Sequence, residues 1–367
     1  MQEIPRFRLA YLIGSTGWGG LEMNQINNAT WMQERGHYTV IYCIEKSPSH
    51  QYLMTGNVPY VAIKKHKNHF DLFKAFTLWK ELKHKGIQHL IIRSVFDMSI
   101  AASVCFFSGK NIKVHYFMEM QLSSNKKQWF RTLRYRYFSS WNCPLDYLKN
   151  QVLDSTKMKK EKVHVIPSAV RNVFFEQRDK KSIRNELGLP DDKLILGLFG
   201  RIDRKKNQLL ALQALHLLSE PNIILLVVGQ ETPDDPQQYL AELKKYTKEK
   251  NLEKQVIFTG YFANTSEYVH AVDACIITSL DESIGLTTLE ALAARKITLG
   301  ANTGGTKELL DKHNGFLFNS ENIQELVNLL YKLKQDELHW VSSPQLLEEN
   351  KFNSVCERVE ELLLSCS

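Results

Sequence analysis

Apolar and polar residues alternate along the first half of the chain in two different periods. Short apolar runs rich in β-branched and aromatic residues predict strands, and longer segments with apolar positions three or four apart predict amphipathic helices. In chain order the pattern predicts a strand at 7–13, a helix at 21–35, a strand at 38–44, a helix at 72–85 and a strand at 89–92. This alternation favours a mostly parallel sheet with helices on its faces.

The same alternation starts again after Pro167. Strands are expected at 194–199, 223–228, 255–258 and 274–278, and helices at 207–219, 239–250 and about 285–294, with a last amphipathic helix at 352–364. The sequence therefore predicts an α/β protein with two Rossmann-like domains, over residues 1–168 and 169–349. We place the boundary within 167–190, where basic and acidic residues alternate from Arg178 to Arg184.

Length and composition agree with this division. A chain of 367 residues exceeds what one hydrophobic core supports, and 43% apolar with 24% charged residues is typical of a soluble globular protein. Neither a transmembrane run of about 20 apolar residues nor a signal-peptide layout is present in the sequence, so we expect a cytoplasmic protein. The six cysteines form no Cys-x-x-Cys pair, which favours buried free thiols over disulfides or a zinc site.

The net charge of +7 is distributed unevenly. Residues 1–170 carry 24 Lys and Arg against 11 Asp and Glu, whereas residues 171–367 carry 23 against 29. A basic first half favours an anionic partner, such as a membrane surface, a phosphorylated acceptor or nucleic acid. The alternative is surface charge that serves solubility alone.

The first candidate site is the glycine-rich loop from Gly14 to Gly20, between the first strand and the first helix. Gly17, Gly19 and Gly20 would let backbone amides approach an anion at the start of that helix. The spacing is not the Gly-x-Gly-x-x-Gly of dinucleotide-binding proteins, although Glu45 at the end of the second strand is placed like their ribose-binding acid. A tight structural turn is the alternative.

A second cluster follows the first strand of the second domain. It holds Arg201, Arg204, Lys205 and Lys206 between a strand and a helix, where ligands bind in open α/β sheets. Fixed cations there suit a diphosphate and can stabilise the negative charge of a leaving group. By itself the cluster could equally be a solvated loop.

A third cluster precedes the helix predicted near 285–294. Glu282 would lie in the loop and Glu290 a little over one turn inside the helix. The first free amides, at Gly285, Leu286 and Thr287, can hold a phosphate, and the two carboxylates can accept hydrogen bonds from sugar hydroxyls.

Glu282 and Glu290 resemble the Glu-x7-Glu signature of the retaining glycosyltransferases of family 4. The resemblance continues along nearly the whole chain, in Gly19-Gly20-x-Glu22, Gly36-His37, the run from Val163 to Val170, Gly200-Arg201 with Lys206, Gly304-Gly305-Thr-Lys-Glu308 and Phe352-Asn-Ser. It implies the GT-B fold, two Rossmann-like domains that face a central cleft. It also implies that the final helix, within 350–367, crosses back to the N-terminal domain.

The resemblance further implies roles for individual residues. Arg201 and Lys206 would bind the donor diphosphate, Glu282 the donor sugar and Glu290 the nucleotide ribose. The implied reaction moves a sugar from a UDP- or GDP-type nucleotide sugar to a hydroxyl of a glycan or lipid-linked acceptor, with retention, in bacterial surface polysaccharide or lipopolysaccharide synthesis. We expect neither a cofactor nor a metal, because no Asp-x-Asp motif is present in the sequence and Arg201, Lys206 and helix amides would neutralise the diphosphate.

The chain departs from the family pattern at two places. After Pro167 it has Ser168-Ala169 where the family usually has Asn-Gly, which changes a turn. The family often supplies a histidine from an N-terminal strand end near the donor sugar, and here Glu119 stands at that register. His115 lies four residues earlier, expected on the same strand face. Either residue is a candidate contact to acceptor or sugar, and a core position is the alternative.

A basic and aromatic segment lies within residues 120–145, which contain no acidic residue. Its cations, Lys126, Lys127, Arg131, Arg134 and Arg136, interleave with aromatic and aliphatic residues, as in helices that lie on an anionic bilayer. The segment could instead bind a phosphorylated acceptor, or its aromatics could pack inward. Without a recognition motif we expect no nucleic-acid partner.

Three other functions compete with sugar transfer. A sugar-nucleotide epimerase shares the expected architecture, an NAD-dependent oxidoreductase would use the loop from Gly14 to Gly20, and a non-catalytic carbohydrate-binding protein would bind without turnover. If the basic segment touches a bilayer, the protein would lie at the inner face of the membrane.

Overall fold

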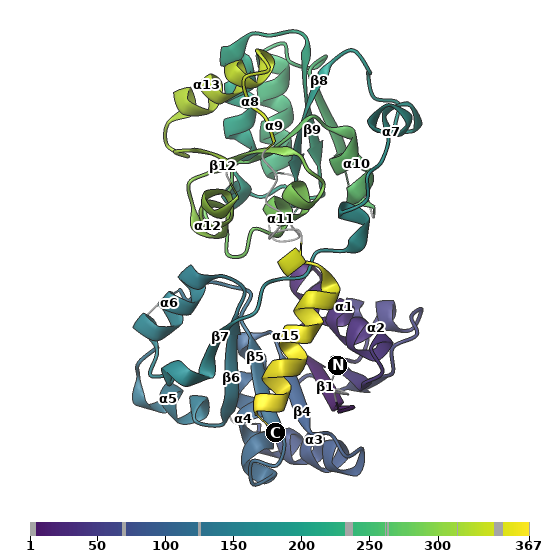
Figure 1. Ribbon diagram of the computed structural model, residues 1–367, viewed down its shortest axis with the longest axis vertical. Coiled ribbons are helices and arrows are strands. Elements are labelled where there is room, and N and C mark those ends of the chain that lie inside the picture. The colour runs from purple at the N-terminus through teal and green to yellow at the C-terminus, as the bar shows by residue number, and fades with distance from the viewer. Residues whose placement is uncertain are drawn as a thin grey trace. The chain divides into compact units, whose positions relative to one another are not determined.

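The computed structural model describes residues 5–67, 71–123, 126–231, 238–260, 262, 264–313, 315–340 and 348–366, with only the backbone at 129–131 (Figure 1). The chain divides into two compact units. The first unit comprises Met1–Ser168 and Phe352–Ser367, and the second comprises Ala169–Lys351.

The first unit is built on a parallel sheet. Over its described residues the sheet has seven strands in the order β3-β2-β1-β4-β5-β6-β7. The strands are β1 (Arg8–Ile13), β2 (Tyr38–Ile44), β3 (Tyr60–Ile63), β4 (His89–Ile92), β5 (Lys113–Phe117), β6 (Phe138–Cys143) and β7 (Val163–Val165). The helices are α1 (Gly20–Glu34), α2 (Pro48–Leu53), α3 (Leu72–His84), α4 (Met98–Phe107), α5 (Trp129–Tyr135), α6 (Asp146–Ser155) and α15 (Phe352–Ser365).

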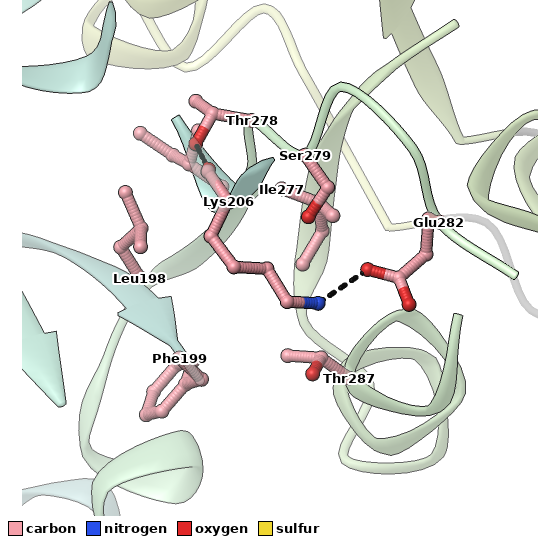
Figure 2. A pocket seen from close by; sticks show the side chains of 9 residues that line it. Leu198, Phe199, Lys206, Ile277, Thr278, Ser279, Glu282 and Thr287 are labelled. Atoms are coloured by element: carbon pink, nitrogen blue, oxygen red, sulfur yellow. Dashed lines mark hydrogen bonds and ion pairs between the residues drawn. The ribbon is translucent and has the colours of Figure 1, made fainter. Parts of the chain in front are cut away.

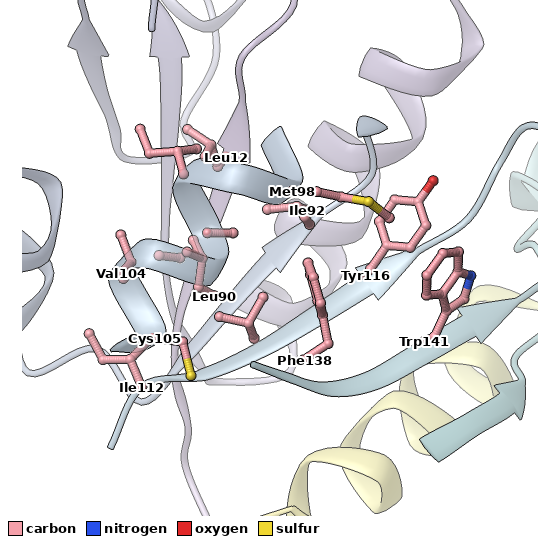
Figure 3. Packing of buried hydrophobic residues seen from close by; sticks show 14 of the residues in the cluster. Leu12, Leu90, Ile92, Met98, Val104, Cys105, Ile112, Tyr116, Phe138 and Trp141 are labelled. Atoms are coloured by element: carbon pink, nitrogen blue, oxygen red, sulfur yellow. The ribbon is translucent and has the colours of Figure 1, made fainter. Parts of the chain in front are cut away.

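The core of this unit lies between the sheet and its helices. Figure 3 shows Leu90, Ile92 and Tyr116 of the strands packed against Met98 and Val104 of α4. Strands β1 and β4 read as near-continuous apolar runs because helices cover both faces of a parallel sheet. The order of the strands reverses between β1 and β4, so the loops after these two strands diverge and leave room for a site.

The second unit repeats this architecture. Its described residues form a sheet of six strands in the order β10-β9-β8-β11-β12-β13, again all parallel. The strands are β8 (Leu194–Phe199), β9 (Ile223–Val228), β10 (Val256–Gly260), β11 (Ala274–Ile277), β12 (Ile297–Ala301) and β13 (Phe316–Phe318). The helices are α7 (Lys180–Glu186), α8 (Gln208–Leu218), α9 (Gln238–Glu249), α10 (Thr265–Ala271), α11 (Leu286–Ala293), α12 (Gly304–Lys312) and α13 (Ile323–Lys334). Here the order reverses between β8 and β11.

The last helix, α15, packs on α1 of the first unit although more than 300 residues separate them (Figure 1). Glu360 is 2% exposed and accepts hydrogen bonds from Arg35 Nε at 2.7 Å and from His37 Nε2 at 2.8 Å. Trp31 and Phe352 stack nearby with ring centroids 5.7 Å apart. A buried carboxylate with a guanidinium partner therefore fixes the final helix to this unit.

The predicted α/β class with two Rossmann-like units is confirmed, and the predicted strands agree closely with β1, β2, β4, β8, β9, β10 and β11. The division between Ser168 and Ala169 falls within the predicted boundary range of 167–190, but the segment from Arg178 to Arg184 is not a linker. It forms α7, and the buried Arg184 donates to Asp273 Oδ2 at 2.7 Å and to the Ala271 carbonyl at 2.8 Å. The alternation of charges there reflects a capped helix with one inward guanidinium.

Two further expectations concern the cysteines and membrane-spanning helices. All six cysteines are free, and five of them are buried, as predicted. Within the described residues, no helix combines the length and the apolar character that crossing a bilayer requires.

Candidate functional site

Two loops meet where the strand order of the second unit reverses. The loop after β8 carries Lys205 and Lys206, and the loop after β11 carries Thr278 and Leu280. The Leu280 amide donates to the Lys205 carbonyl at 2.8 Å, and the Thr278 hydroxyl donates to the Lys206 carbonyl at 2.7 Å. The basic and the acidic clusters of the sequence are thus joined through the backbone.

Lys206 and Glu282 form the polar centre of this site. The Lys206 ammonium donates to Glu282 Oε2 at 2.6 Å, and the two side chains are 26% and 15% exposed (Figure 2). They line a small hollow that is open to solvent. Its other walls are apolar or hydroxyl-bearing side chains of Leu198, Phe199, Ile276, Ile277, Thr278, Ser279 and Thr287.

Local backbone geometry brings the Lys206 side chain into this hollow. Asp203 begins a short 3-10 helix, Arg204–Lys206, by accepting a hydrogen bond from the Lys205 amide at 2.8 Å. Asn207 then takes a left-handed φ of 51°, a conformation that asparagine tolerates, and α8 starts directly after it. Gly229, directly after β9, packs against the start of this loop. It must be glycine, because a Cβ atom there would lie 1.8 Å from the Gly200 carbonyl oxygen.

The start of α11 completes the site. Gly285 is its N-cap, with a left-handed φ of 78°, so the helix begins with free amides beside the Lys206–Glu282 pair. The Gly305 amide of α12 donates to the Glu282 carbonyl at 2.7 Å and fixes the loop that carries this carboxylate. The Gly304-Gly305 motif of the sequence therefore has a structural role next to the hollow.

Glu290 lies on α11 and is partly buried. Burial raises the pKa of its carboxyl group to about 7, and the nearby Arg171 lowers it only in part. The group is therefore poised to gain or lose a proton near neutral pH, as are many functional carboxyl groups.

The remaining cations of this cluster behave differently from Lys206. Arg201 is exposed and does not line the hollow, although Gln208 Nε2 fixes its carbonyl at 2.8 Å. Arg204 pairs with Glu242 at 2.8 Å and lies over the Tyr239 ring. Lys206 is thus the cation of this loop that the fold directs into the hollow.

The glycine-rich loop of the first unit lies at the strand-order reversal next to β1. The Gly14 amide donates to Asp97 Oδ2 at 3.2 Å, while Asp97 Oδ1 is 2.9 Å from His66 Nε2. A Cβ atom on Gly14 would lie 1.9 Å from Asp97 Oδ1, so Gly14 is a packing glycine and its amide is already bonded. Beyond it, Gly17 and Gly20 are exposed, and Gly19 is partly exposed at the N-cap of α1.

Glu119 and His115 do not share a strand face as expected. Strand β5 ends at Phe117, and His115 is 0% exposed with its ring nitrogens bonded to His89 at 3.0 Å and Ser140 at 2.8 Å. His115 thus occupies a core position, so the expected sugar contact is a wrong interpretation for this residue. Desolvation on burial lowers its pKa well below the usual value and keeps the ring neutral.

Glu119 lies beyond the end of β5 and is 8% exposed. Arg93, the residue directly after β4, forms an ion pair with it, and Asn24 of α1 is within 3.4 Å. Burial raises the pKa of Glu119 even though the Arg93 charge lowers it. Sequence patterns did not identify Arg93, Asn24, His66 or Asp97. The one available signal was the position of Arg93 directly after a strand, where ligands bind in open α/β sheets.

The basic segment around α5 is only partly a surface feature. Lys127 and Arg136 are exposed and Lys126 is partly buried, whereas the Arg131 side chain lies outside the described residues. Arg134 turns toward α4, where its guanidinium is 3.4 Å from the Ser99 hydroxyl, and the following Tyr135 is 2% exposed. Part of this segment therefore packs inward.

Comparisons with known proteins concern the second unit and the fold. Residues 179–353 match the family model described as glycosyl transferases group 1. The chain is 32% identical to the alpha-monoglucosyldiacylglycerol synthase of Streptococcus pneumoniae over 49% of its own length and 41% of that protein. It is 32% identical to the D-inositol 3-phosphate glycosyltransferase of Stackebrandtia nassauensis over 50% of its own length and 44% of that protein.

The chain thus spans less than half the length of these curated relatives. In fold it is similar over almost all its length to the Anabaena protein Alr3699/HepE, solved in complex with UDP. The TM-score is 0.83 at 19% identity, covering 98% of this chain and 100% of that one.

The fold is that of GT-B glycosyltransferases, and the site lies in the unit whose sequence matches the group 1 glycosyltransferases. The described residues contain no group of three or more His, Cys, Asp or Glu side chains placed to hold a metal ion.

Proposed function

We propose that this protein is a glycosyltransferase that moves a sugar from a UDP-type nucleotide sugar to a hydroxyl group of a glycan or lipid-linked acceptor. The observation that carries the proposal is the Lys206–Glu282 pair at 2.6 Å beside the free amides that begin α11. An ammonium and helix amides suit a diphosphate, and a carboxylate beside them suits the hydroxyls of the attached sugar. The similarity to Alr3699/HepE, which binds UDP and UDP-glucose, supports the choice of base.

In the proposed reaction the acceptor oxygen bonds to the anomeric carbon as the bond from that carbon to the diphosphate breaks. Negative charge then accumulates on the diphosphate, where Lys206, the α11 amides and the exposed Arg201 would stabilise it. The acceptor proton passes to an oxygen of the departing diphosphate if attack occurs on the same face. We infer retention from the resemblance of Glu282 and Glu290 to the Glu-x7-Glu signature, which also implies that Glu290 would bind the ribose. We infer independence of metal ions from the cations and helix amides that would neutralise the diphosphate.

The acceptor is inferred from the relatives. The Streptococcus pneumoniae relative is named for a glycolipid product, which supports a lipid-linked or glycan acceptor and a place in bacterial surface glycoconjugate synthesis. The first unit would supply the acceptor contacts, with the buried Glu119 as a candidate. The loop of Gly17, Gly19 and Gly20 is a candidate for donor contacts.

The test is a panel of UDP-, GDP- and ADP-sugars with EDTA present. We expect a UDP-sugar to raise the melting temperature of the chain, and we expect Lys206→Ala to abolish that rise. Transfer to glycan or lipid-linked acceptors should then yield product with the anomeric configuration of the donor, followed by NMR. Loss of all nucleotide-sugar binding in EDTA, or inversion of configuration, would contradict the proposal, and epimerised donor without acceptor would favour an epimerase.

A further inference from the structure

Aromatic side chains gather on the outer surface of the first unit. Phe73 is 81% exposed, Phe106 is 60% exposed and Phe76 is 38% exposed. Phenylalanine side chains are usually buried, so a group of exposed ones is unusual. Large contiguous apolar patches on a protein surface mark interaction surfaces. Trp79, Phe107 and Tyr137 are partly buried beside them.

We call these six side chains, on α3, α4 and the residue before β6, the aromatic face. All of them except Phe73 form one connected group of rings. Phe76 contacts Trp79 and Phe107 with ring centroids 5.2 and 5.4 Å apart. Phe106 contacts Phe107 at 5.6 Å and Tyr137 at 6.0 Å. Phe73 lies one helical turn before Phe76, on the same side of α3. Figure 1 shows α3 and α4 side by side at one end of the unit.

Cations surround the aromatic face. The Lys80 ammonium lies 4.7 Å from the centroid of the Phe76 ring, and the Lys83 ammonium lies 5.5 Å from that of Trp79. Lys110, three residues after the end of α4, and Arg136, directly after α5, are also exposed. Within α3, α4 and α5 the one acidic residue is Glu81, which is partly buried.

We propose that the aromatic face docks this protein on an anionic lipid bilayer. Phenylalanine and tryptophan side chains partition into the interfacial layer of a membrane, and lysine ammonium groups on flexible stems reach the anionic headgroups above it. The exposed rings match the apolar part of the interfacial layer, and the cations around them match the negative charge of the headgroups. The sequence predicted membrane contact at 126–136, where the side chains at 129–131 lie outside the described residues. Among the described side chains, the most exposed rings belong to α3 and α4.

The charges disfavour a second copy of the chain as the occupant. A symmetric dimer through this face would place the same cations of both copies against each other, with few acidic groups to offset the repulsion. An anionic bilayer meets the same cations favourably. The inference does not depend on the proposed transfer reaction, since it concerns a different surface of the first unit.

The experiment measures binding of the full chain, without nucleotide, to vesicles of phosphatidylcholine with or without phosphatidylglycerol. We expect binding to vesicles that contain phosphatidylglycerol, with weaker binding at high salt. Phe73→Ser with Phe106→Ser should weaken binding by about tenfold or more, because both exposed rings lose their contact with the bilayer. Lys80→Glu with Lys83→Glu should weaken it by about tenfold or more as well.

Matched controls lie on exposed positions of the second unit. Leu217→Ser with Tyr331→Ser removes two exposed apolar side chains, and Lys244→Glu with Lys248→Glu reverses two exposed charges on one helix. Both controls should bind vesicles like the unaltered chain, and all variants should keep its melting temperature and its stabilisation by UDP. Loss of UDP binding in every variant, including the controls, would count against the proposed function and not against docking on the bilayer.

Three results would overturn the proposal. The first is absence of vesicle binding by the unaltered chain, and the second is equal binding by the Phe73 and Phe106 variant. The third is a dimer in solution that this variant converts to a monomer while vesicle binding persists, which would assign the aromatic face to a second copy.

Discussion

The Lys206 ammonium lies 2.6 Å from a carboxylate oxygen of Glu282, although 76 residues separate them in the chain. This carboxylate thus pairs with the cation that a diphosphate would need. Binding of a nucleotide sugar at this site would therefore exchange one anionic partner of Lys206 for another.

This competition predicts opposite effects of two substitutions on UDP binding. Lys206→Ala should lower the UDP affinity about tenfold or more and kcat by about 100-fold, because it removes a charge-assisted contact to the leaving group. Glu282→Gln should leave the UDP affinity unchanged or higher, because it frees the ammonium, while transfer falls. Titration calorimetry with UDP measures both, with Lys205→Ala as the neighbouring control. Equal loss of UDP affinity in Lys206→Ala and Glu282→Gln would show that the pair is structural.

Glu290 predicts a pH dependence near neutrality. Burial raises its pKa to about 7, so the folded state holds a proton that the unfolded state releases between about pH 4.5 and 7. The stability contributed by the protonated carboxyl is thus present at low pH and decreases as the pH rises through 7, by roughly 2 kcal/mol for a partly exposed group. Glu290→Gln should remove this slope in urea unfolding measured from pH 5 to 8. Glu325→Gln, at an exposed acidic position of the same unit, should keep it.

The same protonation should affect donor binding. In the proposed role, the ionised carboxylate would accept hydrogen bonds from both ribose hydroxyls, so we expect the KM for the donor to rise as the pH falls from 8 to 6. In Glu290→Gln the KM should be higher and nearly independent of pH. A KM that varies with pH equally in both proteins would exclude Glu290 as the titrating group.

Substitutions in the glycine-rich loop should separate an effect on the stability of the fold from an effect on ligand binding. A Cβ atom on Gly14 would lie 1.9 Å from Asp97 Oδ1 and 2.4 Å from His66 Nε2, so Gly14→Ala should destabilise the first unit by about 2 kcal/mol or more. A Cβ atom on Gly17 or Gly19 would meet nothing closer than 3.8 Å. Gly17→Ala should therefore keep the stability and lower donor binding. Unchanged kinetics in Gly17→Ala would remove this loop from the donor site.

The final helix should depend on Glu360. Burial raises the pKa of this carboxyl, but hydrogen bonds from Arg35 and His37 outweigh that effect and lower the pKa overall. Its stabilising contribution is present above the pKa of the unfolded chain and is lost as the pH falls through the lower folded value. Glu360→Ala should cost about 3 kcal/mol at pH 7 because it leaves a guanidinium without its buried partner. Thermal unfolding measures the loss, and the exposed Glu361→Ala is the control; equal melting temperatures would contradict this role.

Sequence patterns located the strands at the centres of both sheets well, because a buried parallel strand needs an unbroken apolar run that is visible locally. Shorter elements at the edges, such as β3 and β13, were not predicted, since three or four residues give too little periodicity. The charge pattern at Arg178–Arg184 did not reveal α7 for a related reason: the burial of Arg184 depends on Asp273, which lies 89 residues further along the chain.

The candidate donor site was also largely visible in the sequence, because ligand loops of α/β sheets follow the strands that the pattern reveals. Residue type and position alone identified Lys206, Glu282, Gly285 and Glu290. Tertiary structure alone decided that Lys206 enters the hollow while Arg204 turns to Glu242, and that His115 is a core residue. It also decided that Phe73 and Phe106 are exposed in one aromatic face. Side-chain direction, burial and pairing depend on residues distant in the chain, and no local pattern records them.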